Sequence, residues 1–160
     1  MKSIQAFTII ELLVVMGIMA ILLSVSTSSL MGPKHKASLN SSINVLISDL
    51  ASQQLKAMVG DTEGRGISPD NYGIYLQTGN YVLFHGTYYP PNDSANFPVN
   101  LGDNIQIDST SFPLSKIIFT AGSGELVSGG GLLIVKNTVT GEKKRITLNQ
   151  YGIITEVISL

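Results

Sequence analysis

An uncharged apolar run near the N-terminus constrains this chain more than any other feature. It reads LLVVMGIMAILL and covers residues 12–23. As a helix, with a rise of ~1.5 Å per residue, the run would span ~18 Å, whereas a bilayer core is ~30 Å thick. The span can be completed by Ile9 and Ile10 before the run and by Val25 and Leu30 after it. The pattern therefore predicts one membrane-spanning helix.

A single carboxylate, Glu11, stands at the head of this run. An ionised side chain at the centre of a membrane helix costs roughly 2.5–3.5 kcal/mol, and such residues usually pair with an opposite charge. Glu11 lies nearer the helix end, where the cost is lower, but it still needs a partner. Lys2 is one candidate. A second candidate is the α-amino group of Phe7, which a cut after Ala6 would place one helical turn from Glu11.

The segment MKSIQA/FTIIELLVVMGIMAILL resembles the N-terminus of type IV prepilins and of type II secretion pseudopilins. The resemblance implies that a prepilin peptidase removes residues 1–6 by cutting between Ala6 and Phe7, and that Phe7 is then N-methylated. It also implies that Glu11 pairs with the N-terminus of a subunit during assembly. Ala6 stands where this family usually has glycine.

Two other interpretations of the N-terminus stay open. An ordinary secretory signal peptide also has a basic start and an apolar run, and Ser24 and Ser26 are spaced like its cleavage site. A carboxylate within the apolar region is unfavourable in such a peptide. An uncleaved signal anchor is the other alternative. Charge does not fix its orientation, because Lys2 lies on one flank and Lys34 and Lys36 lie on the other.

Composition narrows the remaining function classes. The 160 residues carry a net charge of −1, so the chain has no general attraction to nucleic acid. Cysteine is absent, which excludes disulfides, cysteine-based metal sites and a cysteine nucleophile. Only 13% of the residues are charged, well below the ~25% of typical globular domains. These values suit an exported β-rich domain or a packed filament subunit.

Helical periodicity continues after Gly32-Pro33, which marks either the end of the membrane part or a bend. Apolar residues recur there at spacings of three and four, which predicts an amphipathic helix that lies on a sheet and ends at Gly60. Together with the membrane run it could form one rod from Thr8 to Val59. The predicted apolar stripe consists of Leu39, Ile43, Leu46, Ile47, Leu50, Leu55 and Met58.

The remainder of the chain shows short alternating runs that predict an antiparallel meander. Residues 85–104 contain three prolines and are predicted to form a long loop. The fold class is therefore α+β, with a long N-terminal helix packed on an antiparallel β-sheet. We divide the chain into a leader (1–6), a hydrophobic helix (7–31), an amphipathic helix (32–60) and a β-rich domain (61–160). The predicted strands are Tyr72–Gln77, Tyr81–Phe84, Ile105–Asp108, Lys116–Ala121, Leu132–Lys136, Arg145–Leu148 and Ile153–Ile158.

The C-terminal part carries a second resemblance. A strand, the stretch FTAGSGELVSGGG, a further strand and RITLNQYGIITEV are similar to H-type minor pseudopilins and their type IV pilus relatives. The matching positions are residues 117–124 and 146–157. This similarity favours a minor subunit over a major pilin.

Few other residues point to chemistry. Gly122-Ser123-Gly124 has the composition of a phosphate-binding turn, but no helix pattern follows it. Nothing in the sequence places either histidine, His35 or His85, beside a nucleophile. The aspartates lack the spacing of a calcium loop, although some pseudopilins bind calcium in a late loop. They are Asp61, Asp70, Asp93, Asp103 and Asp108.

Two surface features each have a functional and a structural interpretation. Basic residues at 136 and 143–145 could contact DNA phosphates, or could keep an edge strand from pairing with other chains, which we favour. Residues 88–91, Tyr-Tyr-Pro-Pro, could form a recognition loop, or could pack on the sheet.

Together these observations predict a structural minor subunit of a type IV filament-type machine, either a pseudopilin or a minor pilin. We expect no enzymatic activity, cofactor or metal. The expected partners are other pilin or pseudopilin subunits, the prepilin peptidase and an inner-membrane assembly platform. The expected location is the inner membrane, with one crossing and the C-terminal domain outside the cytoplasm, and then a filament. The alternative is a membrane-anchored or secreted β-rich binding module with an ordinary signal sequence.

Overall fold

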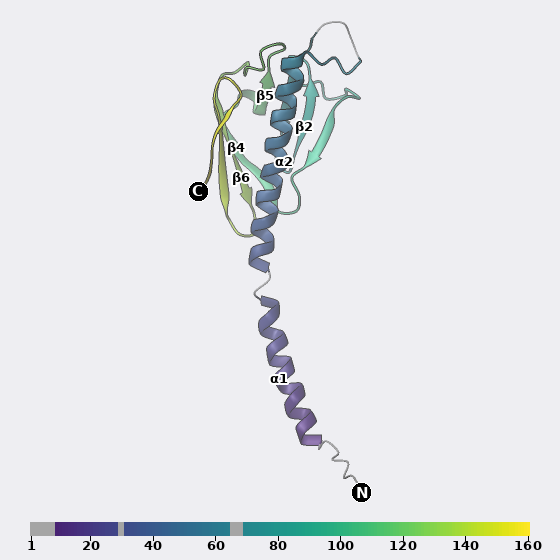
Figure 1. Ribbon diagram of the computed structural model, residues 1–160, viewed down its shortest axis with the longest axis vertical. Helices are drawn as coiled ribbons and strands as arrows, with labels where there is room; N and C mark the ends of the chain where they lie inside the picture. The colour runs from purple at the N-terminus through teal and green to yellow at the C-terminus, as the bar shows by residue number, and fades with distance from the viewer. Residues whose placement is uncertain (1–8, 29–30, 65–68) are drawn as a thin grey trace. The chain divides into compact units, whose positions relative to one another are not determined.

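The computed structural model describes residues 9–28, 31–64 and 69–160 (Figure 1). The chain divides into two compact units, with the boundary between Lys36 and Ala37. The first unit contains helix α1 (Ile9–Ser28) and the start of helix α2 (Met31–Val59). The second contains the rest of α2 and all of the strands. The prediction of one continuous rod depends on Thr8, Ser29 and Leu30, which lie outside the described residues.

Gly32 and Pro33 do not end a helix, because both lie in the first turn of α2. Proline is tolerated there because the first N–H groups of a helix have no intrahelical partner. The other end of α2 follows the prediction. Gly60, at φ +65°, donates its N–H to the carbonyl oxygen of Ala57 at 3.2 Å, and Asp61 donates to Lys56 at 3.0 Å. This is the hydrogen-bond pattern of a glycine-terminated helix.

The buried stripe of α2 differs in part from the predicted one. Leu55 and Met58 are 59% and 50% exposed. Gln53 and Ala57 are buried in their place, and Ile47 is only partly buried. Positions 53 and 57 continue the three-and-four spacing of the stripe, whereas 55 and 58 lie off it. Over residues 38–59 of α2, the buried residues are Leu39, Ile43, Leu46, Leu50, Gln53 and Ala57.

In the part of the chain that the structure describes, eight antiparallel strands form two four-stranded sheets, ordered β3-β2-β1-β5 and β4-β6-β7-β8. The α+β class with a helix on antiparallel sheets is confirmed, but the single meander is wrong. β4 starts a second sheet, and β5 then returns to pair with β1. The strands are β1 (Tyr72–Leu76), β2 (Asn80–His85), β3 (Phe97–Asn100), β4 (Ile105–Thr110), β5 (Lys116–Phe119), β6 (Gly131–Asn137), β7 (Lys143–Leu148) and β8 (Ile154–Ser159).

Strand β3 lies inside the segment that was predicted to be a loop. It contains Pro98, which lacks the N–H that a central strand needs. β3 pairs only with β2 and forms an edge of its sheet, where proline is tolerated. Its existence therefore depends on the partner strand and not on its own pattern.

Buried side chains of α2 and of both sheets form one hydrophobic core. Figure 1 shows α2 beside the strands of the sheets. Tyr72, Ile74 and Phe119 come from the first sheet, and Leu133 and Ile146 come from the second; each of these is at most 2% exposed. Each side chain of this size contributes roughly 1.5–3 kcal/mol when it is fully buried. The two sheets and the C-terminal part of α2 are thereby held as one unit.

Polar side chains of α2 fix the helix on this core. Tyr81, 1% exposed, donates its hydroxyl to the carboxylate of Asp49 at 2.5 Å. Burial raises the pKa of Tyr81 far above its usual range, and the hydrogen bond to Asp49 adds to the effect. Gln54 donates to the carbonyl oxygens of Gly124 at 3.0 Å and Tyr151 at 2.7 Å. These contacts tie two loops of the β region to one helical turn.

We expect Gly152→Ala to lower the free energy of unfolding by about 1–3 kcal/mol. A Cβ there would lie 2.6 Å from Gln54 Nε2 and 2.8 Å from the Phe119 ring. Gly141→Ala is the matched control, because Gly141 has nearly the same φ (+75° against +74°) but no atom within 4 Å of its Cβ position. Thermal melts of both variants test this. Equal losses in the two variants would mean that backbone conformation, and not close packing, makes glycine necessary at 152.

Candidate functional site

The N-terminal part of α1 carries one of the predicted site residues. Glu11 lies in the first turn of the helix, and its side chain is exposed. A carboxylate is favoured at this end because the helix dipole places partial positive charge there. Ala6 and Phe7 lie outside the described residues. Cleavage between them, methylation of Phe7 and the assembly role of Glu11 therefore stay predictions.

The side chains that follow Glu11 on α1 form an exposed apolar surface. Such a surface is apolar around the whole helix and is stable only against lipid or other apolar helices. Its large apolar residues are between 49% and 66% exposed: Leu12, Leu13, Val14, Val15, Met16, Ile18, Met19, Ile21 and Leu22. Within the described ranges, no helix meets the combined requirements of length and apolar character for crossing a membrane.

The turn at residues 122–124, which has the composition of a phosphate-binding turn, forms hydrogen bonds with α2. Gly122 donates its N–H to the carbonyl oxygen of Ala57 at 2.8 Å, and the carbonyl oxygen of Gly124 accepts from Gln54. The turn therefore lies at the C-terminal end of α2. This end of a helix carries partial negative charge, which disfavours phosphate.

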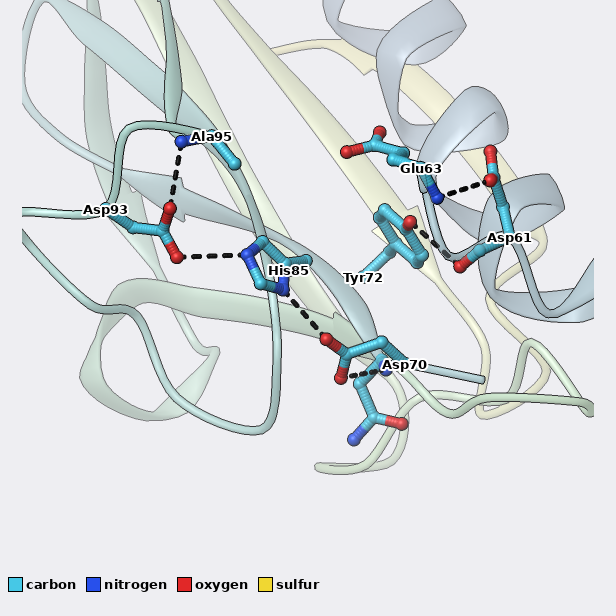
Figure 2. A network of polar contacts seen from close by, with 8 residues as sticks. Asp61, Glu63, Asp70, Tyr72, His85, Asp93 and Ala95 are labelled. Carbon is cyan, nitrogen blue, oxygen red and sulfur yellow. Dashed lines mark hydrogen bonds and ion pairs between the residues drawn. The ribbon is translucent and has the colours of Figure 1, made fainter. Parts of the chain in front are cut away.

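His85 lies between two carboxylates, as Figure 2 shows. Its Nδ1 is 2.7 Å from Asp70 Oδ2, and its Nε2 is 3.0 Å from Asp93 Oδ2. The second oxygens of these carboxylates accept backbone N–H groups from Asn71 and Ala95. Because a carboxylate occupies each ring nitrogen, neither nitrogen is open to take a proton from a nucleophile. The cluster holds the end of β2 to two loops.

Sequence reasoning placed none of these three residues together. The predicted β1–β2 hairpin pointed to one of the two contacts. Its register sets Tyr72 opposite His85, and this brings Asp70, two residues earlier, near the His85 imidazole. Asp93 had no comparable signal, since it lies in an irregular loop. Among the described residues, no group of three or more His, Asp or Glu side chains is arranged to hold a metal ion. The side chain of His35 lies outside the description.

The basic residues of β7 contact neighbouring side chains in the same unit. Lys143 pairs with Asp108 at 2.7 Å, Arg145 pairs with Glu156 at 3.0 Å, and Lys144 donates to Asn40 at 2.5 Å. The hydrogen bond from Lys143 lowers the pKa of Asp108 below its usual value. The interpretation that these charges protect an edge strand is wrong, because β7 lies between β6 and β8.

The two tyrosines of the 88–91 segment differ. Tyr89 stacks on Tyr75, with ring centroids 4.5 Å apart, and meets Phe84 edge-on at 5.6 Å. Tyr88 is 72% exposed. One residue therefore packs on the sheet, and its neighbour is presented to the surroundings.

Comparison with known proteins agrees with this architecture. A model of the prokaryotic N-terminal methylation motif matches residues 1–27. The chain is also similar to a solved structure of the minor pseudopilin EpsH from the type 2 secretion system of Vibrio cholerae. The TM-score is 0.52 at 15% sequence identity, over 76% of this chain and 97% of that chain. No curated protein sequence matches the chain.

At this identity the structural likeness shows the fold, and the methylation motif supplies a separate observation from the N-terminus. The motif covers residues 1–27, whereas the sheets begin at Tyr72. The chain therefore carries the prokaryotic N-terminal methylation motif at residues 1–27 and has a fold similar to that of a minor pseudopilin.

Proposed function

We propose that this chain is a structural minor subunit, of the H type, in a type IV filament-type machine. The observation that carries the proposal is the methylation motif at residues 1–27, which includes the exposed apolar part of α1 with Glu11 in its first turn. A helix of this kind needs an apolar environment along its length. Lipid supplies this environment before assembly, and the helices of neighbouring subunits supply it in the filament.

In this mechanism Glu11 sets the position of the incoming subunit. A desolvated carboxylate needs a cation, and the methylated amine of a neighbouring Phe7 supplies one. The attraction between the two charges is large only where water is excluded. The pair therefore forms in the filament core and favours one register between subunits.

The partners in this proposal are other pilin or pseudopilin subunits, the prepilin peptidase and an inner-membrane assembly platform. The chain crosses the inner membrane once, with the β-rich unit outside the cytoplasm, and enters an envelope or surface filament after assembly. It acts by assembly and not by catalysis. The arrangement of His85 between two carboxylates is consistent with a structural role for that residue.

Processing provides the direct test. We expect the mature chain to lack residues 1–6 and to begin with N-methylated Phe7, as read by mass spectrometry of the membrane fraction. Ala6→Gly should be cleaved at least as well as the natural sequence. An intact Met1 in cells with active prepilin peptidase contradicts the proposal. A mature start near Thr27 supports the secreted binding module instead.

A further inference from the structure

A groove of about 200 Å³ lies beside residues 116–118 of β5. Three of the large apolar side chains that line it are exposed: Tyr88 (72%), Leu114 (81%) and Val127 (55%). Ile118 also lines it, and Lys116 is its one charged lining residue. Exposed apolar residues that gather around a hollow, with polar groups at its rim, mark interaction sites more often than scattered ones do.

The backbone of β5 offers hydrogen bonds to the same groove. Among the described strands, the only one that pairs with β5 is β1; on the other side of β5, Phe119 forms an isolated antiparallel bridge to Leu126. The carbonyl oxygen of Ile118 accepts from Val127 N–H at 3.0 Å, and Lys116 N–H is bonded to Pro113. The backbone N–H and C=O groups of successive strand residues point to alternate sides of the strand. Those of residues 116 and 118 therefore both point away from β1. The C=O of Lys116 and the N–H of Ile118 take no part in the turn and loop hydrogen bonds of the described chain.

The turn before β5 holds Leu114 over the groove at a conformational cost. Leu114 has φ +53° and ψ +25°, and Ser115 has φ +56°. Residues with a Cβ are disfavoured in this left-handed region, where glycine is not. Such residues persist where the surroundings enforce them, and they gather at binding and active sites. Leu114 contributes little to the core, because it is 81% exposed.

Tyr89 covers part of the sheet face that carries Ile118, in the sheet that contains β5, β1 and β2. Ile118, Gly73 and Phe84 lie in one row across β5, β1 and β2. Tyr89 covers the Phe84 end of the row, and Phe84 is 2% exposed. The Ile118 end opens into the groove. An apolar group bound in the groove would cover Ile118 as Tyr89 covers Phe84.

We propose that the β5 edge binds an extended segment of a second polypeptide by short strand addition. Its backbone pairs with the N–H of Ile118 and the C=O of Lys116. One apolar side chain of the segment fills the groove over Ile118. A carboxylate two residues away lies on the same face, because strand side chains alternate, and it meets the Lys116 ammonium. Main-chain pairing with side-chain pockets is a recurring mode of peptide recognition. The proposal does not depend on how the N-terminus is processed.

Short peptides provide the probe, with the full chain in detergent micelles. We would titrate acetyl-Thr-Phe-Thr-Asp-Thr-amide and its reversed sequence, since the strand direction is open. Binding of either should shift the NMR signals of the Ile118 amide and the Val127 methyl groups, and should slow deuterium exchange of the Ile118 N–H. Replacing Phe by Ala, or Asp by Lys, in the peptide should weaken binding several-fold.

Two variants of the turn separate binding from stability. Leu114→Gly relieves the left-handed strain and removes a wall of the groove, so the melting temperature should rise while peptide affinity falls on the order of tenfold. Ser115→Gly is the matched control. It relieves the same kind of strain, but Ser115 does not line the groove, so stability should rise without loss of affinity. Lys116→Gln should abolish the preference for Asp over Lys in the peptide.

The outcomes divide clearly. Saturable shifts at Ile118 that need both Phe and Asp and are lost in Leu114→Gly support the proposal. Absence of shifts with millimolar peptide in either direction overturns it. The proposal is also overturned if the Ala and Lys peptides bind as tightly as the parent peptide. It is overturned as well if the Leu114→Gly variant binds the parent peptide with unchanged affinity. Either result leaves the proposed filament function untouched, because that function is tested at Phe7 and Glu11.

Discussion

Glu11→Leu should leave membrane insertion and cleavage intact but sharply reduce recovery of the subunit in filaments. The substitution makes the apolar segment more hydrophobic, so insertion does not suffer. Cleavage depends on the residues that flank the cut, Ala6 and Phe7. In the filament, the incoming amine of Phe7 meets no opposite charge. An unpaired charge inside an apolar environment costs several kcal/mol, so the loss of incorporation should be large.

Blots of membrane and sheared-filament fractions, from cells with each variant, measure this. Glu11→Gln should behave like Glu11→Leu, because it keeps the shape of the side chain and removes the charge. A nearby apolar change, Val14→Leu, is the control for disturbance of the helix surface and should assemble normally. Normal recovery of Glu11→Leu in filaments would rule out the assembly role and leave the signal-anchor interpretation as the better account.

Leu46→Asp should unfold the β-rich unit. Leu46 is fully buried between α2 and the sheets, and a carboxylate there would lack both water and a partner. The expected loss is about 4 kcal/mol or more, which is comparable with the ~5–15 kcal/mol that holds a typical domain. Thermal melts and limited proteolysis of the full chain in detergent would detect the change as loss of the cooperative transition and rapid digestion.

Substitutions at two other positions of α2 serve as controls for Leu46→Asp. Leu55→Asp should have little effect, because Leu55 is 59% exposed. Ile47→Asp should lie between them, because Ile47 is partly buried against the core. The same ranking should appear in both measurements. If Leu55→Asp were as harmful as Leu46→Asp, the helix would present a different face to the sheets from the one described here.

The N-terminal segment was predictable because its signals are local. Charge, apolar length and the spacing of Phe7 and Glu11 all lie within a few helical turns, and the methylation motif is found over the same residues. The end of α2 at Gly60 was predictable for the same reason, since a glycine-terminated helix is closed by hydrogen bonds to residues within one turn of it.

Strand positions were largely predictable, but strand partners were not. Alternation marks where a strand runs, and seven of the eight strands overlap their predicted ranges. It does not say which strands pair. The assignment of β4 to a second sheet, and the return of β5 to β1, depend on long-range packing against α2. β3 was missed because Pro98 breaks the pattern, and only the β2 edge makes it a strand.

Sequence alone therefore determined the apolar helix, its single carboxylate, the helix end at Gly60 and the α+β class, because each depends on neighbours along the chain. Only the tertiary structure decided which face of α2 is buried, where Gln53 and Ala57 replace Leu55 and Met58. It also decided that Asp70 and Asp93 meet at His85, and that Leu114 stands over the edge of β5. These features join segments that are distant in sequence, and the free energy that fixes them comes from packing the sheets and α2 around one core.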